Sequence, residues 1–79
     1  MFVAILNYVK PLAEADRLLP EHMEFVKRHY QSGHFLASGR KNPRTGGVIL
    51  AQAASREALL EILQQDPFTQ AGVAEYEVT

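Results

Sequence analysis

The first segment of the chain, Phe2–Val9, is apolar on both faces of the strand it predicts. Its alternate residues form two sets, Phe2/Ala4/Leu6/Tyr8 and Val3/Ile5/Asn7/Val9, and only Asn7 interrupts them. A strand of this kind needs cover on both sides. The chain has 79 residues and no cysteine, so it buries only about 60% of its unfolded surface and has no disulfide to compensate. We therefore expect one small domain, residues 1–79, that gains further burial from a second copy.

Helical periodicity follows the first strand. A helix over 18–30 is predicted by an apolar stripe at i, i+4, i+7 and i+11, formed by Leu19, Met23, Val26 and Tyr30. Pro20 suits the first turn of this helix, and Gly33 suits its exit. The preceding segment, 12–17, is acidic and rich in alanine, and it fits either a short helix or a loop.

The second half predicts a hairpin, a helix and a last strand. The apolar segments 35–39 and 48–53 flank a connection dense in turn residues. Ser55 is a suitable N-cap for a second helix. Asp66 can cap a further short helical turn that begins at Pro67. Residues 73–78 are predicted to form the last strand. The order β-α-β-β-α-β predicts an α+β ferredoxin-like fold, a four-stranded antiparallel sheet with both helices on one face. We expect a homodimer through the open sheet face.

Charge and hydropathy exclude several classes of protein. Eight Lys and Arg oppose nine Asp and Glu, giving a net charge of −1, which argues against nucleic-acid binding. The segment 48–53 also lacks the aromatic residues that stack on RNA bases. The apolar start is too short for a membrane helix and has neither the basic region nor the cleavage site of a signal peptide. We expect a cytoplasmic protein.

His22 and Asp66 are the candidates for acid-base chemistry. His22 lies at the margin of the predicted apolar stripe, where it is either a general acid or base or a boundary histidine satisfied by one hydrogen bond. Asp66 is either a purely structural helix cap or a carboxylate that also orients an imidazole. His29 and His34 are predicted to lie on the surface. Because His22 and His29 are about 10 Å apart along a helix, they cannot share a metal ion, and we predict neither a metal nor a cofactor.

The turn after the second strand concentrates positive charge. Arg40, Lys41 and Arg44 lie within five residues, and Ser38-Gly39 can bring backbone N–H groups close to a ligand. This pattern fits a site for a substrate carboxylate or phenolate. It fits a solvated hairpin equally well.

Several of these motifs together resemble the YciI-like (YCII-related) family. They are Pro20-Glu21-His22, Ala37-Ser38-Gly39 and Asp66-Pro67-Phe68 followed by Ala71-Gly72-Val73. The resemblance implies a dimeric α+β barrel with a His-Asp pair, here His22 and Asp66, in a cleft lined by Ser38 and Gly39. It also implies lyase or dehydrohalogenase chemistry on small cyclic compounds.

Two positions depart from the family pattern. Leu19 stands where relatives often carry arginine, and Arg40 stands where they often carry proline, so Arg40 or Arg44 is expected to replace the anion-binding arginine. The chain also stops soon after the last strand, where relatives often continue. The leading hypothesis is a small-molecule enzyme that uses His22 and Asp66. The alternative is a ligand-binding or accessory domain that uses the same cleft without catalysis.

Overall fold

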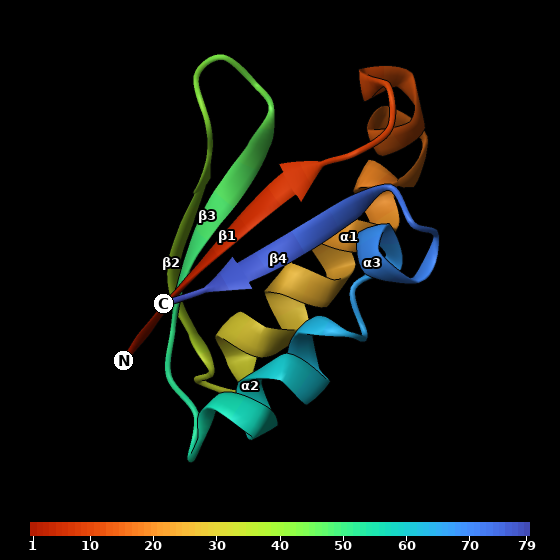
Figure 1. Ribbon diagram of the computed structural model, residues 1–79. Coiled ribbons are helices and arrows are strands. Elements are labelled where there is room, and N and C mark those ends of the chain that lie inside the picture. The colour runs from red at the N-terminus through yellow and green to blue at the C-terminus, as the bar shows by residue number, and fades with distance from the viewer.

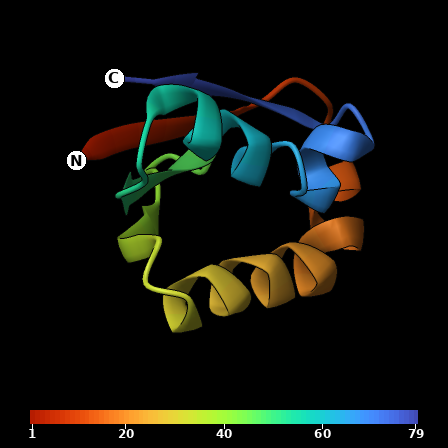
Figure 2. The ribbon, with the colours of Figure 1, turned by 90° about the horizontal axis from the view of Figure 1, so that it is seen from below.

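A four-stranded antiparallel sheet in the order β2-β3-β1-β4 forms one layer of the computed structural model, which describes all 79 residues. The helices lie together on one side of this sheet (Figures 1 and 2). This arrangement confirms the ferredoxin-like α+β fold. The elements are β1 (Phe2–Tyr8), α1 (Leu12–Gln31), β2 (Phe35–Arg40), β3 (Gly46–Ala51), α2 (Arg56–Leu63), α3 (Pro67–Gln70) and β4 (Ala74–Val78).

The central strand β1 pairs with β3 on one side and with β4 on the other. Its side chains alternate, so Ala4 and Leu6 are buried under the helices. Val3 and Ile5 point to the opposite face and remain partly exposed. The open face is therefore apolar along the middle of the sheet, as the two-faced pattern of β1 predicts.

Helix α1 is longer than the periodicity predicts, because it begins at Leu12 and runs for 20 residues. The expectation that Pro20 occupies the first turn was wrong, since Pro20 lies inside the helix. The extra turns are stabilised by tertiary packing, because Ala15 is fully buried against the second hydrophobic cluster. Packing of this kind commonly outweighs the unfavourable helix propensity of a single proline. Gly33 follows the end of the helix, as predicted, and its φ is 86°.

The predicted apolar stripe of α1 differs from the set of residues that the helix buries in the core. Met23 and Tyr30 are exposed, and of the four stripe residues only Val26 is buried. The buried residues of the helix are Ala15, His22, Phe25 and Val26. The helix has two apolar surfaces, and periodicity alone could not tell the surface that packs in the core from one that lines a cleft.

Several boundaries differ from the sequence prediction by one or two residues. Strand β3 starts at Gly46 and ends at Ala51, two residues before the predicted range at both ends. Gly46 fits there because a Cβ at this position would lie 1.8 Å from the carbonyl oxygen of Leu6. Strand β2 extends to Arg40, while β1 ends at Tyr8 and β4 begins at Ala74. Glycine and polar residues can form the backbone hydrogen bonds of a strand. A prediction from hydrophobic residues alone therefore misplaces strand ends made of such residues.

Both predicted helix caps are present. The Ser55 hydroxyl accepts a hydrogen bond from the backbone N–H of Ala58 at 3.1 Å, at the start of α2. The Asp66 carboxylate accepts one from the N–H of Phe68 at 2.9 Å, at the start of α3. The cap at Asp66 fixes a carboxylate beneath the middle of α1. None of the helices combines the length and the apolarity needed to cross a membrane.

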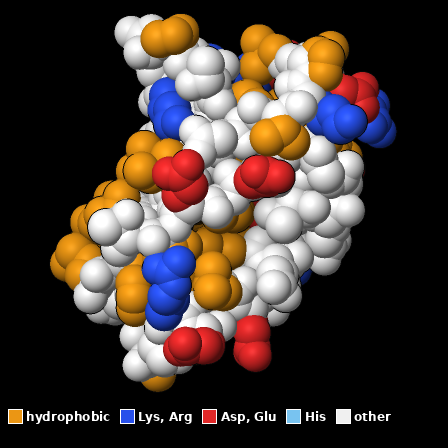
Figure 3. All heavy atoms as spheres, in the orientation of Figure 1, with side chains coloured by type: hydrophobic (Ala, Val, Ile, Leu, Met, Phe, Trp, Pro, Cys, Tyr) orange, Lys and Arg blue, Asp and Glu red, His pale blue; other side chains and the backbone are white.

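The face of the sheet opposite the helices has no cover within the chain. Val48 is 38% exposed there, opposite Ile5, while Val3 faces Leu50. Glu75 and Glu77 of β4 share the face, because they pair with Asn7 and Ile5. In Figure 3, hydrophobic side chains gather along the β2–β3 side and acidic side chains lie nearer β4.

Candidate functional site

The imidazole of His22 lies between the two hydrophobic clusters of the core. The imidazole stacks on the ring of Phe68, with ring centroids 4.1 Å apart and planes 9° from parallel. The centroid of the Phe25 ring lies 6.3 Å from that of the imidazole. Phe25 belongs to one cluster and Phe68 to the other. The residue is only 9% exposed. Its position in the middle of α1, with a phenyl ring against one face, leaves the imidazole little freedom to rotate.

His22 and Asp66 are in direct contact, although 44 residues separate them in sequence. Nδ1 of His22 lies 2.9 Å from both carboxylate oxygens of Asp66. An ionised carboxylate can only accept hydrogen bonds, so the contact assigns the proton to Nδ1. Nε2 makes no hydrogen bond within the chain and is not among the buried unpaired atoms. In its neutral form, the ring would therefore present a lone pair at Nε2.

The carboxylate of Asp66 is fully buried and accepts hydrogen bonds from three donors. Besides the bond from His22, the carboxylate accepts one from the backbone N–H of Phe68, at an N–O distance of 2.9 Å, and one from the hydroxyl of Tyr76, at an O–O distance of 2.6 Å. A buried charge is costly unless it is paired and hydrogen-bonded, and three donors meet that requirement here. The cap of α3 and the contact with His22 therefore coexist in one side chain.

Tyr76 is a member of this network that the sequence did not reveal. It lies on β4 opposite Leu6, on the helix-covered face of the sheet. Burial raises the pKa of its hydroxyl well above the usual range, and the negative charge of Asp66 raises it further. The hydroxyl thus stays protonated and serves as a donor. A lone aromatic on the inward face of the last strand gives no sequence signal for this role, because it is typical of core packing.

A cleft of about 260 Å³ opens between α1 and the β2–β3 hairpin, and His22 forms part of its wall. The structure brings the other predicted binding residues, Ser38, Gly39, Arg40 and Arg44, to the same cleft, whereas Asp66 lies outside it, in contact with His22. The remaining lining is mostly apolar: Leu6, Tyr8, Leu19, Met23, Val26, Gly46, Gly47, Val48 and Ile49. Leu19 and Met23, two residues of the predicted apolar stripe, thus line the cleft.

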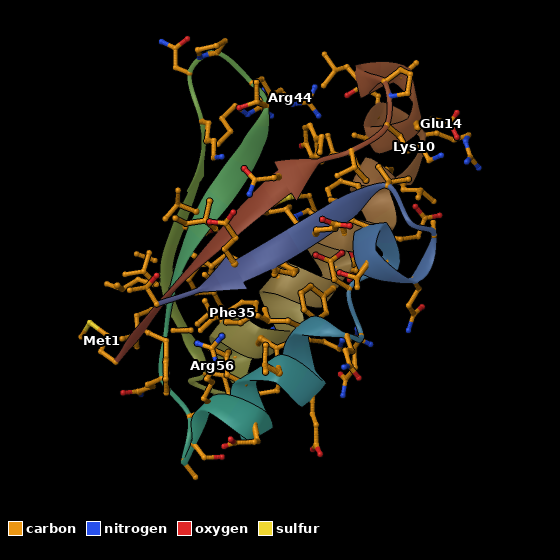
Figure 4. All side chains as sticks on the ribbon, in the orientation of Figure 1. Met1, Lys10, Glu14, Phe35, Arg44 and Arg56 are labelled. Atoms are coloured by element: carbon orange, nitrogen blue, oxygen red, sulfur yellow. The ribbon has the colours of Figure 1, made fainter.

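Two hydrogen bonds fix polar side chains at the cleft. The hydroxyl of Tyr30 donates to Oγ of Ser38 at 2.6 Å, from α1 to β2. Nη1 of Arg44 donates to Oδ1 of Asp16 at 2.6 Å, from the hairpin to α1. The hydrogen bond with Asp16 raises the pKa of Arg44 above its ordinary value. Figure 4 labels Arg44 near the tip of the β2–β3 hairpin. From the sequence, Tyr30 was named only as part of the apolar stripe, and Asp16 was not named.

The other two histidines lie outside the cleft. His34 is near the surface and contacts Ser32 at 2.8 Å. His29 is only partly exposed, and its ring packs against Phe25 and Phe35, so the prediction of a surface residue was wrong for His29. Burial lowers the pKa of His29, and the nearby His34 lowers it further. No three His, Asp or Glu side chains gather where they could hold a metal ion.

The fold and the cleft define the class of protein: a ferredoxin-like α+β domain with a histidine and a carboxylate in contact beside a small pocket. The chain belongs to the YCII-related family, since the model of the YCII-related domain matches residues 1–79. Comparison with curated protein sequences gave no match.

A solved structure with a similar fold is the 5-chloro-2-hydroxyhydroquinone dehydrochlorinase (TftG) from Burkholderia phenoliruptrix AC1100, in complex with 2,5-dihydroxybenzoquinone. The TM-score is 0.82 at 19% sequence identity, over 100% of this chain and 91% of that one. At this level of identity the likeness establishes the fold.

Proposed function

We propose that the protein is a small-molecule enzyme in which His22 is the general base or acid and Asp66 orients it. The observation that carries the proposal is the contact of Nδ1 with a fully buried carboxylate, which leaves Nε2 free at a cleft. A carboxylate at Nδ1 fixes the tautomer and stabilises the imidazolium that forms when Nε2 takes a proton. An imidazole held in this way can take a proton from a substrate, or give one to it, through Nε2.

The reaction class we propose is elimination, of the lyase or dehydrohalogenase kind, on a small cyclic compound. Nε2 of His22 removes a proton from the substrate, and the electron pair left behind forms a new double bond. The leaving group departs with its bonding pair as an anion. Positive charge from Arg40 or Arg44 and backbone N–H groups of Ser38-Gly39 would stabilise the developing negative charge. Membership of the YCII-related family and the fold shared with a dehydrochlorinase support this class.

The test is a turnover assay with matched histidine variants. Wild-type protein is incubated with chlorinated hydroxyhydroquinones, starting with 5-chloro-2-hydroxyhydroquinone, and chloride release is measured. His22→Gln can still donate a hydrogen bond to Asp66 but has no base, so it should release no chloride. His34→Gln, outside the cleft, should behave as wild type. Full activity of His22→Gln would refute the assignment, while binding by wild type without any turnover would favour an accessory ligand-binding domain.

We also propose that a second copy of the chain covers the open face of the sheet. The face carries Val3, Ile5, Val48 and Leu50 in two register pairs, and a small domain without disulfides gains stability from such burial. Dimerisation through this face would leave the cleft accessible, because the cleft opens on the helix side of the sheet.

A further inference from the structure

The two carboxylate oxygens of Asp66 each accept one hydrogen bond from outside the imidazole. Oδ1 accepts from the backbone N–H of Phe68 at 2.9 Å, and Oδ2 accepts from the hydroxyl of Tyr76 at 2.6 Å. Nδ1 of His22 lies 2.9 Å from each oxygen. One donor on either side therefore fixes the plane of the carboxylate, and the imidazole meets the carboxylate between its two oxygens.

The two flanking donors differ in what the fold requires of them. The N–H of Phe68 belongs to the cap of α3, so the helix itself supplies this donor. Tyr76 comes from β4, where it lies opposite Leu6 on the helix-covered face of the sheet. A phenyl ring would fill the same space. Core packing on β4 therefore requires the ring of Tyr76 but not its hydroxyl.

Tyr76 is placed to act on His22 but not on a ligand. It is absent from the lining of the cleft that His22 borders, and it faces a separate hollow between α2, α3 and β4. Burial raises the pKa of Tyr76, and the negative charge of Asp66 raises it further, so the hydroxyl keeps its proton and remains a donor. Any effect of this hydroxyl on chemistry in the cleft must pass through Asp66.

A hydrogen bond to a carboxylate reduces the attraction between that carboxylate and a neighbouring imidazolium. The bond stabilises the ionised carboxylate, and the negative charge that it engages is less available to the imidazole. A buried carboxylate with fewer donors would therefore hold the imidazolium more strongly. A protonated ring cannot take a proton from a substrate, so the strength of this attraction determines how basic a useful His22 can be.

Asp66 is the only charged side chain in contact with the imidazole. The other contacts of the ring are aromatic, with Phe25 and Phe68. Other titratable or charged groups on the surrounding elements make no hydrogen bond to His22 or Asp66: Glu21 and Glu24 on α1, Tyr8 on β1, Arg40 and Arg44 at the hairpin, and Glu75 and Glu77 on the opposite face of β4. The glutamates of α1 are exposed and screened by water, and the arginines keep their charge throughout the neutral range.

We propose that Tyr76 is a positioning residue that sets the basicity of His22 through Asp66. Its hydroxyl holds Oδ2, so the carboxylate orients the imidazole without keeping the ring protonated near neutral pH. The catalytic meaning of this role rests on the proposed function and deepens it, because it extends the site from the pair of His22 and Asp66 to the last strand.

Titration of His22 in Tyr76→Phe tests the proposal without a substrate. The ring signals of His22 are followed by NMR in full-length protein between about pH 5 and pH 8. Loss of the hydroxyl should raise the pH at which His22 is half protonated by about 0.5–1 unit, less than the ~1–3 units that a full neighbouring charge produces. A hydroxyl that merely anchored Asp66 would give no rise or a fall, because a loosened carboxylate holds the imidazolium less well. Either of these results would overturn the proposal.

Two matched variants establish the route through Asp66. Tyr30→Phe removes the same group from α1, about 12 Å along the helix from His22, where it bonds to Ser38; it should leave the titration of His22 unchanged. In the Asp66→Asn background, Tyr76→Phe should no longer raise the half-protonation pH, because the amide has no charge to compensate. An equal rise in either of these proteins would refute a role that acts through Asp66.

The pH dependence of turnover separates this proposal from the proposed function. If the protein releases chloride as proposed, Tyr76→Phe should move the rising limb of the pH–rate profile to higher pH by the shift seen in the titration, with KM unchanged because Tyr76 lies outside the cleft. A limb that stays in place while the titration moves would exclude His22 as the base and leave the coupling to Tyr76 intact. A titration that does not move would exclude the coupling, whatever the turnover.

Discussion

Replacing Asp66 with asparagine changes one atom of the site and reverses the hydrogen-bond polarity of the network. In the wild type, the carboxylate accepts from the N–H of Phe68, the hydroxyl of Tyr76 and Nδ1 of His22. The amide oxygen of the introduced side chain could keep the bond from Phe68. The amide nitrogen, facing Tyr76 and His22, can only donate. Nδ1 of His22 lies 2.9 Å from both oxygen positions, so a proton on Nδ1 would face an amide hydrogen. We expect Nδ1 to accept from the amide nitrogen instead, with the proton of the ring on Nε2.

The cost of this substitution follows from the donors it leaves unpaired. The hydroxyl of Tyr76 can accept from the new amide but loses its own acceptor, and a buried unpaired donor costs about 1–3 kcal/mol. The variant no longer buries a carboxylate, which offsets part of the loss. We expect a net decrease of about 1–2 kcal/mol in the free energy of unfolding, or roughly 4–16 °C in Tm for a domain of this size. Asp66→Ala should cost more, because it leaves three donors unpaired.

Two measurements check this prediction. Urea unfolding followed by circular dichroism gives the stability, with wild type and variant compared at equal protein concentration. Long-range 15N correlation spectra of the His22 ring distinguish the two tautomers. If Asp66→Asn kept the proton on Nδ1, or matched the wild type in stability, the inferred network would be wrong. With Nε2 protonated, the ring cannot act as a base, so turnover should fall by a factor on the order of 10³–10⁴.

Three further perturbations follow from the structure. Tyr76→Phe removes one donor to Asp66 and should lower the unfolding free energy by about 1–2 kcal/mol in urea titrations; an unchanged midpoint would contradict the bond. Because burial lowers the pKa of His29, the unfolded chain binds its proton more readily, and stability should fall as the pH drops below about 6.5. His29→Phe should lose less stability than wild type between pH 7 and pH 5, and equal losses would count against this account. Light scattering at micromolar concentration should give twice the chain mass of 8.8 kDa, and Ile5→Lys should give the single-chain mass; a wild-type monomer would reject the proposed dimer.

The sequence predicted the order of elements, because that order depends on strong local signals. Capping and proline at Asp66-Pro67 fixed the start of α3, and the strand pattern fixed the topology. The pair of His22 and Asp66 was a candidate by residue type and family resemblance. Its distance depended on how α1 and α3 pack, which no local pattern encodes.

The start of α1 and the role of Tyr76 could not be predicted for a similar reason. Propensity alone places Pro20 at the start of the helix, whereas burial of Ala15 in a distant cluster carries the helix back to Leu12. That extension places Asp16 within reach of Arg44. Tyr76 became visible only when the sheet register set β4 beside the site. Tertiary packing determined each of these contacts.

Under the proposed function, Asp66 both caps α3 and orients His22, and the two roles constrain position 66 unequally. Selection for folding alone would tolerate serine, threonine or asparagine there at a modest cost in stability, because each can cap α3. Selection for a base at His22 would accept only a carboxylate. Lineages that lose the chemistry should therefore drift first to these neutral caps at the position corresponding to Asp66, while the helix and the fold persist. The residue found there would separate active members of the family from those that keep only the scaffold.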